Sequence, residues 1–299
     1  MSTADDDNNN LKCAACGKVD VGLKACAACK LVKYCMASCQ KAHWSQHKKE
    51  CKKRAAELHD EALFKKPPTR DECDICMLPL PLHPSEQKYQ PCCGKMMCFG
   101  CIHAAHMADN RKLCPFCRTP EANSEVGYIE RLKKRVDVDD AIAMRNLGGY
   151  YSDGVRDLPQ DYNKAMELLL RAGELGDALS NRNIAIAYLT GQGVERDVKK
   201  AKHYYELAAM GGDVFARHNL GNLEMDTGNT SRALKHWMIS AGAGDDDSLH
   251  NVRQCFMLGY ATKDDFEKAL RAHKEAKDEM KSDQRETAEA YLRSVGAIG

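Results

Sequence analysis

The sequence lacks a long hydrophobic run, a recognisable targeting segment and a large net charge, and each absence argues against a class of protein. No apolar stretch approaches the roughly 20 residues that a membrane-spanning helix needs. The opening MSTADDDNNN is acidic and polar, unlike a secretory signal or an arginine-rich transit peptide. We therefore expect a disordered tail over 1–12 and an intracellular protein, in the cytoplasm, the nucleus or both. Lysine plus arginine number 44 and aspartate plus glutamate 43, which argues against a dedicated nucleic-acid binder.

Cysteine is nearly absent from the second half of the chain. Of the 16 cysteines, all but Cys255 lie between Cys13 and Cys117. A secreted disulfide scaffold can be this rich in cysteine, but such a protein needs a signal sequence. In a reducing compartment thiols stay free, and repeated C-x-x-C pairs are then typical of zinc sites. We expect the front third of the chain to be organised by zinc, and Cys255 to be a small core residue.

The first cysteine cluster, over 13–51, contains eight candidate zinc ligands in four pairs. These pairs are Cys13-x2-Cys16, Cys26-x2-Cys29, Cys35-x3-Cys39 and His47-x3-Cys51. Structural zinc takes four ligands, so eight ligands suit two ions. A C-x-x-C pair forms a tight knuckle, and an x3 spacing places two ligands one turn apart on a helix face. We therefore expect two short helical segments, each donating a pair. His43 could compete with His47 as a ligand, but only His47 has the x3 spacing to Cys51.

This pattern resembles the MYND finger, since Gln40 after Cys39, Trp44, His47, Cys51 and Tyr34 stand as in that family. The resemblance implies two interleaved sites, one from Cys13, Cys16, Cys35 and Cys39 and the other from Cys26, Cys29, His47 and Cys51. It also implies binding of short proline-containing peptides, with Gln40 and Trp44 as contact residues. The alternative for Trp44 is that it packs the small core of the finger. The basic residues over 48–54 are expected to form a solvated face.

The second cluster, over 71–120, contains CDIC at 73–76, CCGKMMCFGC at 92–101 and CPFCR at 114–118. It resembles a RING finger through Ile75 before the second cysteine, Pro115 after the seventh and Arg118 after the last. Where most RING fingers have a histidine after the third cysteine, this chain has Lys95. The pattern is therefore that of an all-cysteine variant of the family.

The eight cysteines of the second cluster suit two zinc ions if the adjacent Cys92 and Cys93 both act as ligands. The interleaved assignment would place Cys73, Cys76, Cys98 and Cys101 in one site and Cys92, Cys93, Cys114 and Cys117 in the other. Adjacent ligands on one ion strain the backbone, so His103 or His106 is the alternative that could complete the second site. The two clusters together imply four Zn²⁺ ions, two per finger, all of them structural because protein fills every position.

The region 139–299 carries a different pattern, a repeat of small residues. Ala165, Ala201, Ala233 and Ala269 recur 36, 32 and 36 residues apart, and a second small residue follows each after seven positions. We expect four helix pairs, with first helices near 140–151, 178–189, 214–225 and 248–258. The second helices are expected near 161–173, 197–210, 230–242 and 264–278, and a capping helix near 284–293. Segments 52–70, a charged helix stopped by two prolines, and 121–138 are expected to be linkers.

These units resemble Sel-one-like repeats, relatives of tetratricopeptide repeats, which implies a solenoid with a concave face that binds other proteins. The expected fold class is thus small zinc-stabilised α+β fingers followed by an all-α helical-repeat solenoid. Gly-Asp at the corners ends one helix and caps the next.

Two functional hypotheses follow from these resemblances. The RING resemblance implies a ubiquitin ligase that docks a ubiquitin-conjugating enzyme and orients its ubiquitin, without a nucleophile or other catalytic residue of its own. Ile75 and Pro115 would form the docking surface, and Arg118 would bridge enzyme and ubiquitin. The competing hypothesis is a non-catalytic scaffold or adaptor that binds proteins through both fingers and the repeats. A nucleic-acid regulator acting through the basic residues over 48–54 is a weaker third reading.

Overall fold

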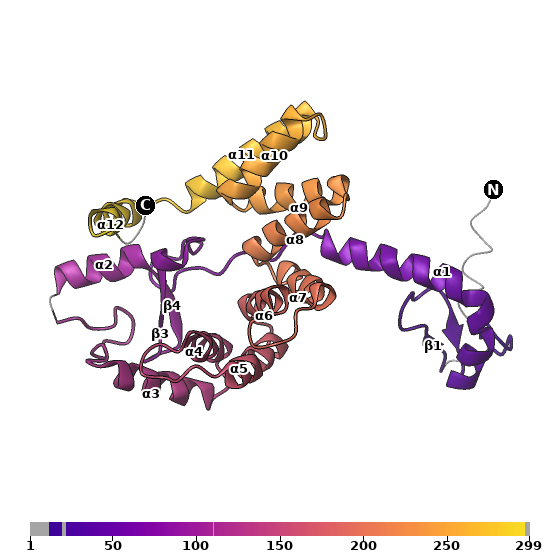
Figure 1. Ribbon diagram of the computed structural model, residues 1–299, viewed down its shortest axis with the longest axis horizontal. Helices are drawn as coiled ribbons and strands as arrows, with labels where there is room; N and C mark the ends of the chain where they lie inside the picture. Colours follow the sequence, from indigo (N-terminus) through magenta and orange to yellow (C-terminus); the bar gives the residue numbers. More distant parts are fainter. Residues whose placement is uncertain (1–11, 20–21, 110, 297–299) are drawn as a thin grey trace. The chain divides into compact units, whose positions relative to one another are not determined.

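The computed structural model describes residues 12–19, 22–109 and 111–296 (Figure 1). Apart from Lys12, the tail expected over 1–12 lies outside the described residues. The chain divides into two compact units, Met1–Lys65 and Lys66–Gly299. The division falls inside the segment expected as a linker, and the second cysteine cluster shares a unit with the repeats.

The first unit is a small antiparallel ladder followed by one long helix. Strand β1 (Lys24–Ala25) pairs with β2 (Lys33–Tyr34), and α1 runs over Ala37–Leu63. The expectation of two short helical segments was wrong, because α1 is continuous over 27 residues and Cys35 precedes it. The segment after Cys51 is rich in good helix formers, and Arg54 pairs with Glu57 and Glu61 on the same face. The helix therefore continues until it nears the prolines.

The second unit begins with a finger of one hairpin and one helix. A short 3-10 helix η2 (Pro84–Glu86) leads into β3 (Gln87–Gln90), which pairs antiparallel with β4 (Lys95–Cys98). Helix α2 (Phe99–Ala108) follows directly. One core cluster of this finger consists of Leu80, Met97 and Ile102 with four buried cysteines, Cys73, Cys98, Cys101 and Cys114. So few apolar side chains make a small core, and small domains of this kind commonly gain their stability from bound metal.

The repeats form the helical pairs that the period predicts, with every boundary within two residues of expectation. The first helices are α4 (Ala141–Asp153), α6 (Ala178–Thr190), α8 (Val214–Asp226) and α10 (Asp246–Met257). The second helices are α5 (Tyr162–Glu174), α7 (Val198–Met210), α9 (Thr230–Gly242) and α11 (Lys263–Glu279). Helix α12 (Asp283–Ser294) ends the described stack. Cys255 is buried against Ala233, Val252 and Ala269, as a small core residue should be.

Each first helix begins at an aspartate that caps it. Asp140, Asp177, Asp213 and Asp245 each accept a hydrogen bond from a main-chain N–H three residues on. At three of these corners a glycine with φ between 94° and 98° precedes the aspartate, a conformation that side chains disfavour. Gly-Asp thus ends one helix and starts the next, as the sequence indicates.

Segment 121–138, expected as a linker, contains an additional helix, α3 (Glu125–Val136). Ser124 caps it, and Ile129 and Leu132 are buried on one face, three residues apart. These two residues share a core with Tyr89 of β3 and with Ala143 and Leu147 of α4. The segment therefore joins the finger to the first repeat through packing rather than through a free connection.

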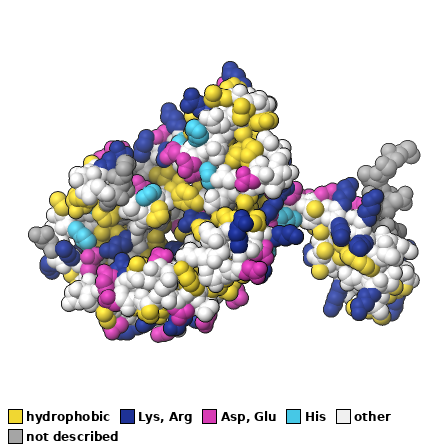
Figure 2. Space-filling model, viewed as in Figure 1, with side chains coloured by type: hydrophobic (Ala, Val, Ile, Leu, Met, Phe, Trp, Pro, Cys, Tyr) yellow, Lys and Arg dark blue, Asp and Glu magenta, His cyan; other side chains and the backbone are white. Residues whose placement is uncertain are grey.

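The finger also meets the other end of the repeat stack, because α2 lies beside α12 (Figure 1). Within this unit, the finger contacts both the first and the last helices of the array. On the face drawn in Figure 2, acidic and basic side chains are interspersed over the unit Lys66–Gly299, whereas Lys and Arg predominate on the smaller unit. In the part of the chain that the structure describes, no helix combines the length and apolar character needed to cross a bilayer.

Candidate metal centres

The structure brings the residues of the first cluster into two groups of four. One group contains Cys13, Cys16, Cys35 and Cys39, and the other contains Cys26, Cys29, His47 and Cys51; within each, the candidate ligand atoms all lie within 4.8 Å of one another. The groups are interleaved, since the first and third pairs of the sequence meet and the second and fourth pairs meet. These are the sets that the MYND resemblance implies.

His47, rather than His43, faces the thiols. The Nε2 atom of His47 lies 3.2 Å from Sγ of Cys29, and His47 is buried. The Nδ1 atom of His43 lies 3.0 Å from the Tyr34 hydroxyl instead. His43 therefore supports the finger by holding Tyr34, and its ring stacks on that of His47 at 5.7 Å between centroids.

The second cluster also forms two interleaved groups, both made of cysteine alone. Cys73, Cys76, Cys98 and Cys101 form one, and Cys92, Cys93, Cys114 and Cys117 form the other. His103 instead lies against Tyr291, with ring centroids 4.9 Å apart, and Nε2 of His106 lies 3.9 Å from Glu121. The geometry favours the adjacent Cys92 and Cys93 over either histidine.

The sulfur spacing in these groups suits zinc. A tetrahedral site with Zn–S bonds of about 2.3 Å has sulfur–sulfur edges of about 3.8 Å. The corresponding separations are 3.7 Å for Cys16–Cys35, 3.6 Å for Cys35–Cys39, 3.7 Å for Cys26–Cys51, 3.9 Å for Cys76–Cys98, 3.9 Å for Cys93–Cys114 and 3.4 Å for Cys92–Cys117. All 16 cysteines are free thiols. The donor sets therefore fit metal and not disulfides.

In each cluster, hydrogen bonds favour the thiolate form of particular cysteines, the form that binds metal. The hydrogen bond from the Cys98 thiol, aided by main-chain N–H groups, lowers the pKa of Cys73 to about 4 although burial opposes this. Main-chain N–H groups at Cys16 and Cys35 lower the pKa of Cys13 to about 6. Their neighbours shift the other way: the hydrogen bond with Cys35 raises the pKa of Cys39 to about 12, and the hydrogen bond with Cys73 raises that of Cys98.

Residues far along the chain complete the surroundings of the second cluster. Nη2 of Arg285 in α12 lies 3.4 Å from Sγ of Cys76, and Sγ of Cys101 lies 3.7 Å from Oε1 of Gln284. Gly100 has no room for a side chain, because a Cβ there would lie 2.9 Å from the Arg285 side chain. Sequence reasoning missed these contacts, since nothing in the α12 sequence marks it as the neighbour of a finger.

The remaining predicted contact residues lie on the surfaces of the two fingers. Ile75 and Phe116 project from the two knuckles of the second cluster and are 41% and 47% exposed. Lys95, in the position of the missing histidine, bonds to Asp74 at 2.9 Å and lies over the Phe116 ring. Pro115 is half-buried and Arg118 is exposed. Phe116 is the member of this surface that sequence reasoning missed; its place between Pro115 and Cys117 was the available signal.

In the first finger, Trp44 is 42% exposed on α1 and meets His47 edge-on. Gln40 is half-buried, and its Nε2 lies 3.9 Å from Sγ of Cys26. Trp44 thus leaves part of its indole on the surface of the finger, and its role as a peptide contact stays a prediction.

Comparison with known proteins agrees with this description. The MYND finger family matches residues 13–51, and the Sel1 repeat family matches 141–177 and 178–213. The chain therefore contains a MYND finger and Sel1 repeats, both of which are protein-interaction modules. The MYND match and the cysteine groups together support zinc as the metal.

Relatives cover parts of the chain only. This chain is 46% identical to the SET domain and MYND-type zinc finger protein 6 of Schizosaccharomyces pombe over 48 residues. That match covers 16% of this chain and 10% of the relative. It is 28% identical to the ERAD-associated E3 ubiquitin-protein ligase component HRD3B of Arabidopsis thaliana over 106 residues. That match covers 35% of this chain and 16% of the relative. A crystal structure of a Sel1 repeat protein from Oxalobacter formigenes aligns with a TM-score of 0.44 and 24% identity, covering 55% of this chain and 69% of that one.

Proposed function

We propose that the protein is a RING-type ubiquitin ligase, or a subunit of one, whose MYND finger and repeats select the proteins it acts on. The observation that carries the proposal is the pair of interleaved cysteine groups with Ile75 and Phe116 exposed on adjacent knuckles. A conjugating enzyme needs an apolar surface held rigidly by the metal sites. The resemblance of part of the chain to a protein described as a ubiquitin ligase component supports the same class.

In this proposal the eight residues of each finger hold two Zn²⁺ ions, four in all. The ligands are Cys13, Cys16, Cys35 and Cys39; Cys26, Cys29, His47 and Cys51; Cys73, Cys76, Cys98 and Cys101; and Cys92, Cys93, Cys114 and Cys117. Zinc with four protein ligands has no open position, so its role is to fold and stiffen the finger. Metal binding in small fingers is worth on the order of 10–16 kcal/mol per ion.

The docking surface would combine apolar knuckles with one cation. Ile75 and Pro115 supply the apolar contacts, joined by Phe116, whose ring is covered on one side by Lys95. Lys95 also bonds to Asp74 of the first knuckle, so it holds the two knuckles together. Arg118 directly follows the last ligand and is exposed, which leaves its guanidinium free to bridge the conjugating enzyme and ubiquitin by hydrogen bonds.

The other modules would choose the target. Gln40 and Trp44 would contact proline-containing segments at the MYND finger, because an exposed indole packs well on proline rings. The repeats would bind further proteins, and the mixed surface charge that Figure 2 shows over their unit does not suit nucleic acid.

Autoubiquitination of the full-length, zinc-loaded chain with a panel of conjugating enzymes tests the proposal. We expect activity with at least one enzyme, and its loss in Ile75→Ala and Arg118→Ala. Val126→Ala, an exposed apolar residue on α3, and Arg111→Ala, an exposed arginine, are matched controls that should keep full activity. Zinc content measured on every variant shows whether the finger is intact.

A non-catalytic adaptor is the second candidate. The adjacent Cys92 and Cys93, and Lys95 in place of a histidine, make this finger irregular on one side. If the protein binds four zinc ions but shows no autoubiquitination with any enzyme of the panel, the adaptor is favoured and the ligase is rejected.

A further inference from the structure

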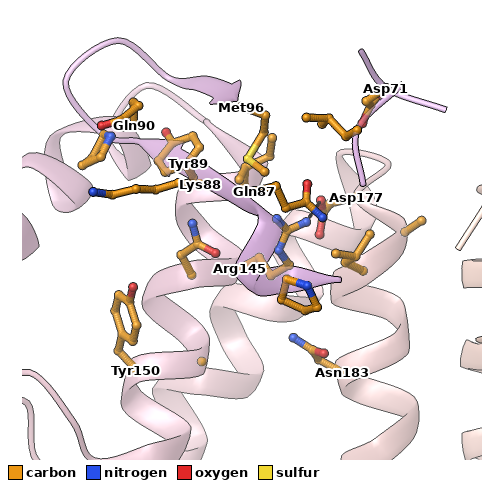
Figure 3. Close-up of a pocket in the computed structure, with 18 of the residues that line it drawn as sticks. Asp71, Gln87, Lys88, Tyr89, Gln90, Met96, Arg145, Tyr150, Asp177 and Asn183 are labelled. Carbon is orange, nitrogen blue, oxygen red and sulfur yellow. Dashed lines mark hydrogen bonds and ion pairs between the residues drawn. The ribbon is translucent and has the colours of Figure 1, made fainter. Parts of the chain in front are cut away.

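A cavity of about 1140 Å³ lies between the second finger and the repeats (Figure 3). All four residues of β3 line one side, and residues of α4, α6 and the start of α8 line the other. Figure 3 shows Lys88, Tyr89 and Gln90 on one side, with Tyr150 and Asn183 across from them. The volume exceeds that of sites for drug-sized molecules, so the cavity suits a larger ligand.

The finger side of the cavity offers main-chain hydrogen-bonding groups. Strand β3 belongs to a two-stranded sheet, so β4 occupies only one of its edges. Among the described residues, no main-chain group outside the hairpin bonds to the main chain of Lys88 or Tyr89. An unpaired strand edge carries N–H and C=O groups that can accept another extended chain. Gln90 strengthens this indication, because it is 4% exposed and its Nε2 has no partner within the described residues.

The repeat side of the cavity offers carboxamides at equivalent positions. Asn146 of α4 and Asn183 of α6 each precede the buried residue that marks the repeat register, Leu147 and Ile184. Both asparagines line the cavity, and neither has a hydrogen-bond partner among the described residues. A carboxamide presents one acceptor and two donors, which match the C=O and N–H of a peptide group.

The charges of the cavity wall are balanced. Six cationic and six acidic side chains line it. Four of the cations are paired with carboxylates, in the pairs Lys88–Glu121, Arg145–Asp177, Arg156–Glu125 and Arg182–Asp213. A wall of this kind does not attract phosphates, because binding nucleic acid requires cations that are free to neutralise them.

We propose that this cavity binds an extended segment of a partner protein, recognised through its main chain. One edge of the segment adds to β3 as a third strand, and the carboxamides of Asn146 and Asn183 bond to peptide groups on its other edge. Such a segment lies beside the second cysteine cluster, so it belongs to a ubiquitination substrate if the ligase proposal holds. Peptide binding itself does not depend on that proposal and is tested separately.

The test begins with a phage-displayed library of random 12-residue peptides, selected on the full-length zinc-loaded protein. Affinities of the selected peptides are then measured by fluorescence polarisation for the wild type and for Asn146→Ala, Asn183→Ala and Asn163→Ala. Asn163 is an exposed asparagine of α5 outside the cavity and serves as the matched control. We expect each cavity variant to weaken binding about tenfold and the control to leave it unchanged. Methylation of alternate peptide nitrogens should abolish binding without any change in the protein.

Hydrogen exchange locates the bound peptide. In the wild type, the bound peptide should slow hydrogen exchange at the main-chain amides of β3. Selected peptides that bind equally well to Asn183→Ala, or that leave the exchange of β3 unchanged, would overturn the proposal. Competition by single-stranded RNA that depends on the same asparagines would also overturn it. An inactive ligase assay with intact peptide binding would reject only the proposed function.

Discussion

Nη2 of Arg285 lies 3.4 Å from Sγ of Cys76, although 209 residues separate them in the chain. Nη1 of the same guanidinium donates to the carbonyl oxygens of Pro79 and Met280, each at 2.8 Å. Four thiolates around Zn²⁺ leave a net charge of about −2, which is costly to bury without a nearby cation. Arg285 thus joins the last helix of the repeats to the charge of the second cysteine cluster.

Replacing Arg285 should weaken both the metal site and the fold. In Arg285→Gln we expect faster zinc release to a chelator and a loss of about 1.5–3 kcal/mol in the free energy of unfolding, since a charged hydrogen-bond donor is lost. Arg293→Gln, at the exposed end of the same helix, is the control and should change little. Equal release rates for the two variants would show that Arg285 does not support the metal site.

The hydroxyl of Tyr89 bonds to Oδ2 of Asp140 at 2.7 Å, which links the finger to the cap of the first repeat helix. Arg135 of α3 pairs with the same carboxylate at 2.6 Å, as Arg145 and Arg182 of one repeat pair with the capping aspartate of the next. Tyr89 adds a second hydrogen bond to Asp140, from the finger. Tyr89→Phe should lower the free energy of unfolding by about 1–2 kcal/mol in urea titrations. Tyr291→Phe, whose ring is half-exposed on α12, is the comparison. A urea midpoint of Tyr89→Phe equal to that of the wild type would contradict this account.

His236 should make the repeats less stable in mild acid. Burial, with the nearby cations Arg217 and Arg232, lowers the pKa of His236 to about 3, against 6.5 in an unfolded chain. Glu224 and Lys202 also act on the ring, in opposite directions. Because the folded state holds the neutral ring, stability is full above pH 6.5 and falls as the pH drops below it. By pH 5 the loss is about 2 kcal/mol.

Chemical denaturation at pH 7.5 and pH 5 measures this effect. His236→Gln should lose about 2 kcal/mol less than the wild type between the two pH values. His250→Gln, an exposed histidine of α10, should behave like the wild type. Acid also weakens thiolate zinc sites, but equally in all three proteins, so the difference isolates His236. Identical pH dependence in wild type and His236→Gln would reject the prediction.

The adjacent cysteines can be tested by counting metal ions. We expect the wild type to hold four zinc ions by elemental analysis, and Cys92→Ser and Cys93→Ser to hold about three each, because a site with three thiolates binds zinc much more weakly. Cys255→Ser, a buried cysteine outside the clusters, is the control for the loss of a thiol and should keep four. If Cys93→Ser kept four zinc ions and His103→Ala lost one, His103 rather than Cys93 would be the fourth ligand of that site.

The repeat architecture could be predicted well because its signals are local and recur. Burial of Ala165, Ala201 and Ala233 follows from their spacing, and the Gly-Asp corners mark helix ends. The grouping of cysteines could be anticipated for a similar reason, since pairs two or three residues apart can reach one ion. Helix α3 was missed because 121–138 lies between two strong patterns and carries only two buried apolar residues, Ile129 and Leu132.

The continuous helix α1 shows where local reasoning fails. The x3 spacing of Cys35 and Cys39 suits a helix turn, yet Cys35 lies before the helix and Cys39 within it. Two ligands can converge on one point from several backbone conformations, so spacing restricts the distance between them without determining the secondary structure.

By itself, the sequence determined which residues could share a metal ion and where each repeat helix begins and ends, because both depend on neighbours within a few turns. The tertiary structure alone decided that the second finger contacts both ends of the repeats, through Tyr89 and Asp140 at one end and Cys76 and Arg285 at the other. That outcome depends on small rotations between successive helix pairs, which add up along the array. The total rotation therefore cannot be predicted from any short stretch of sequence.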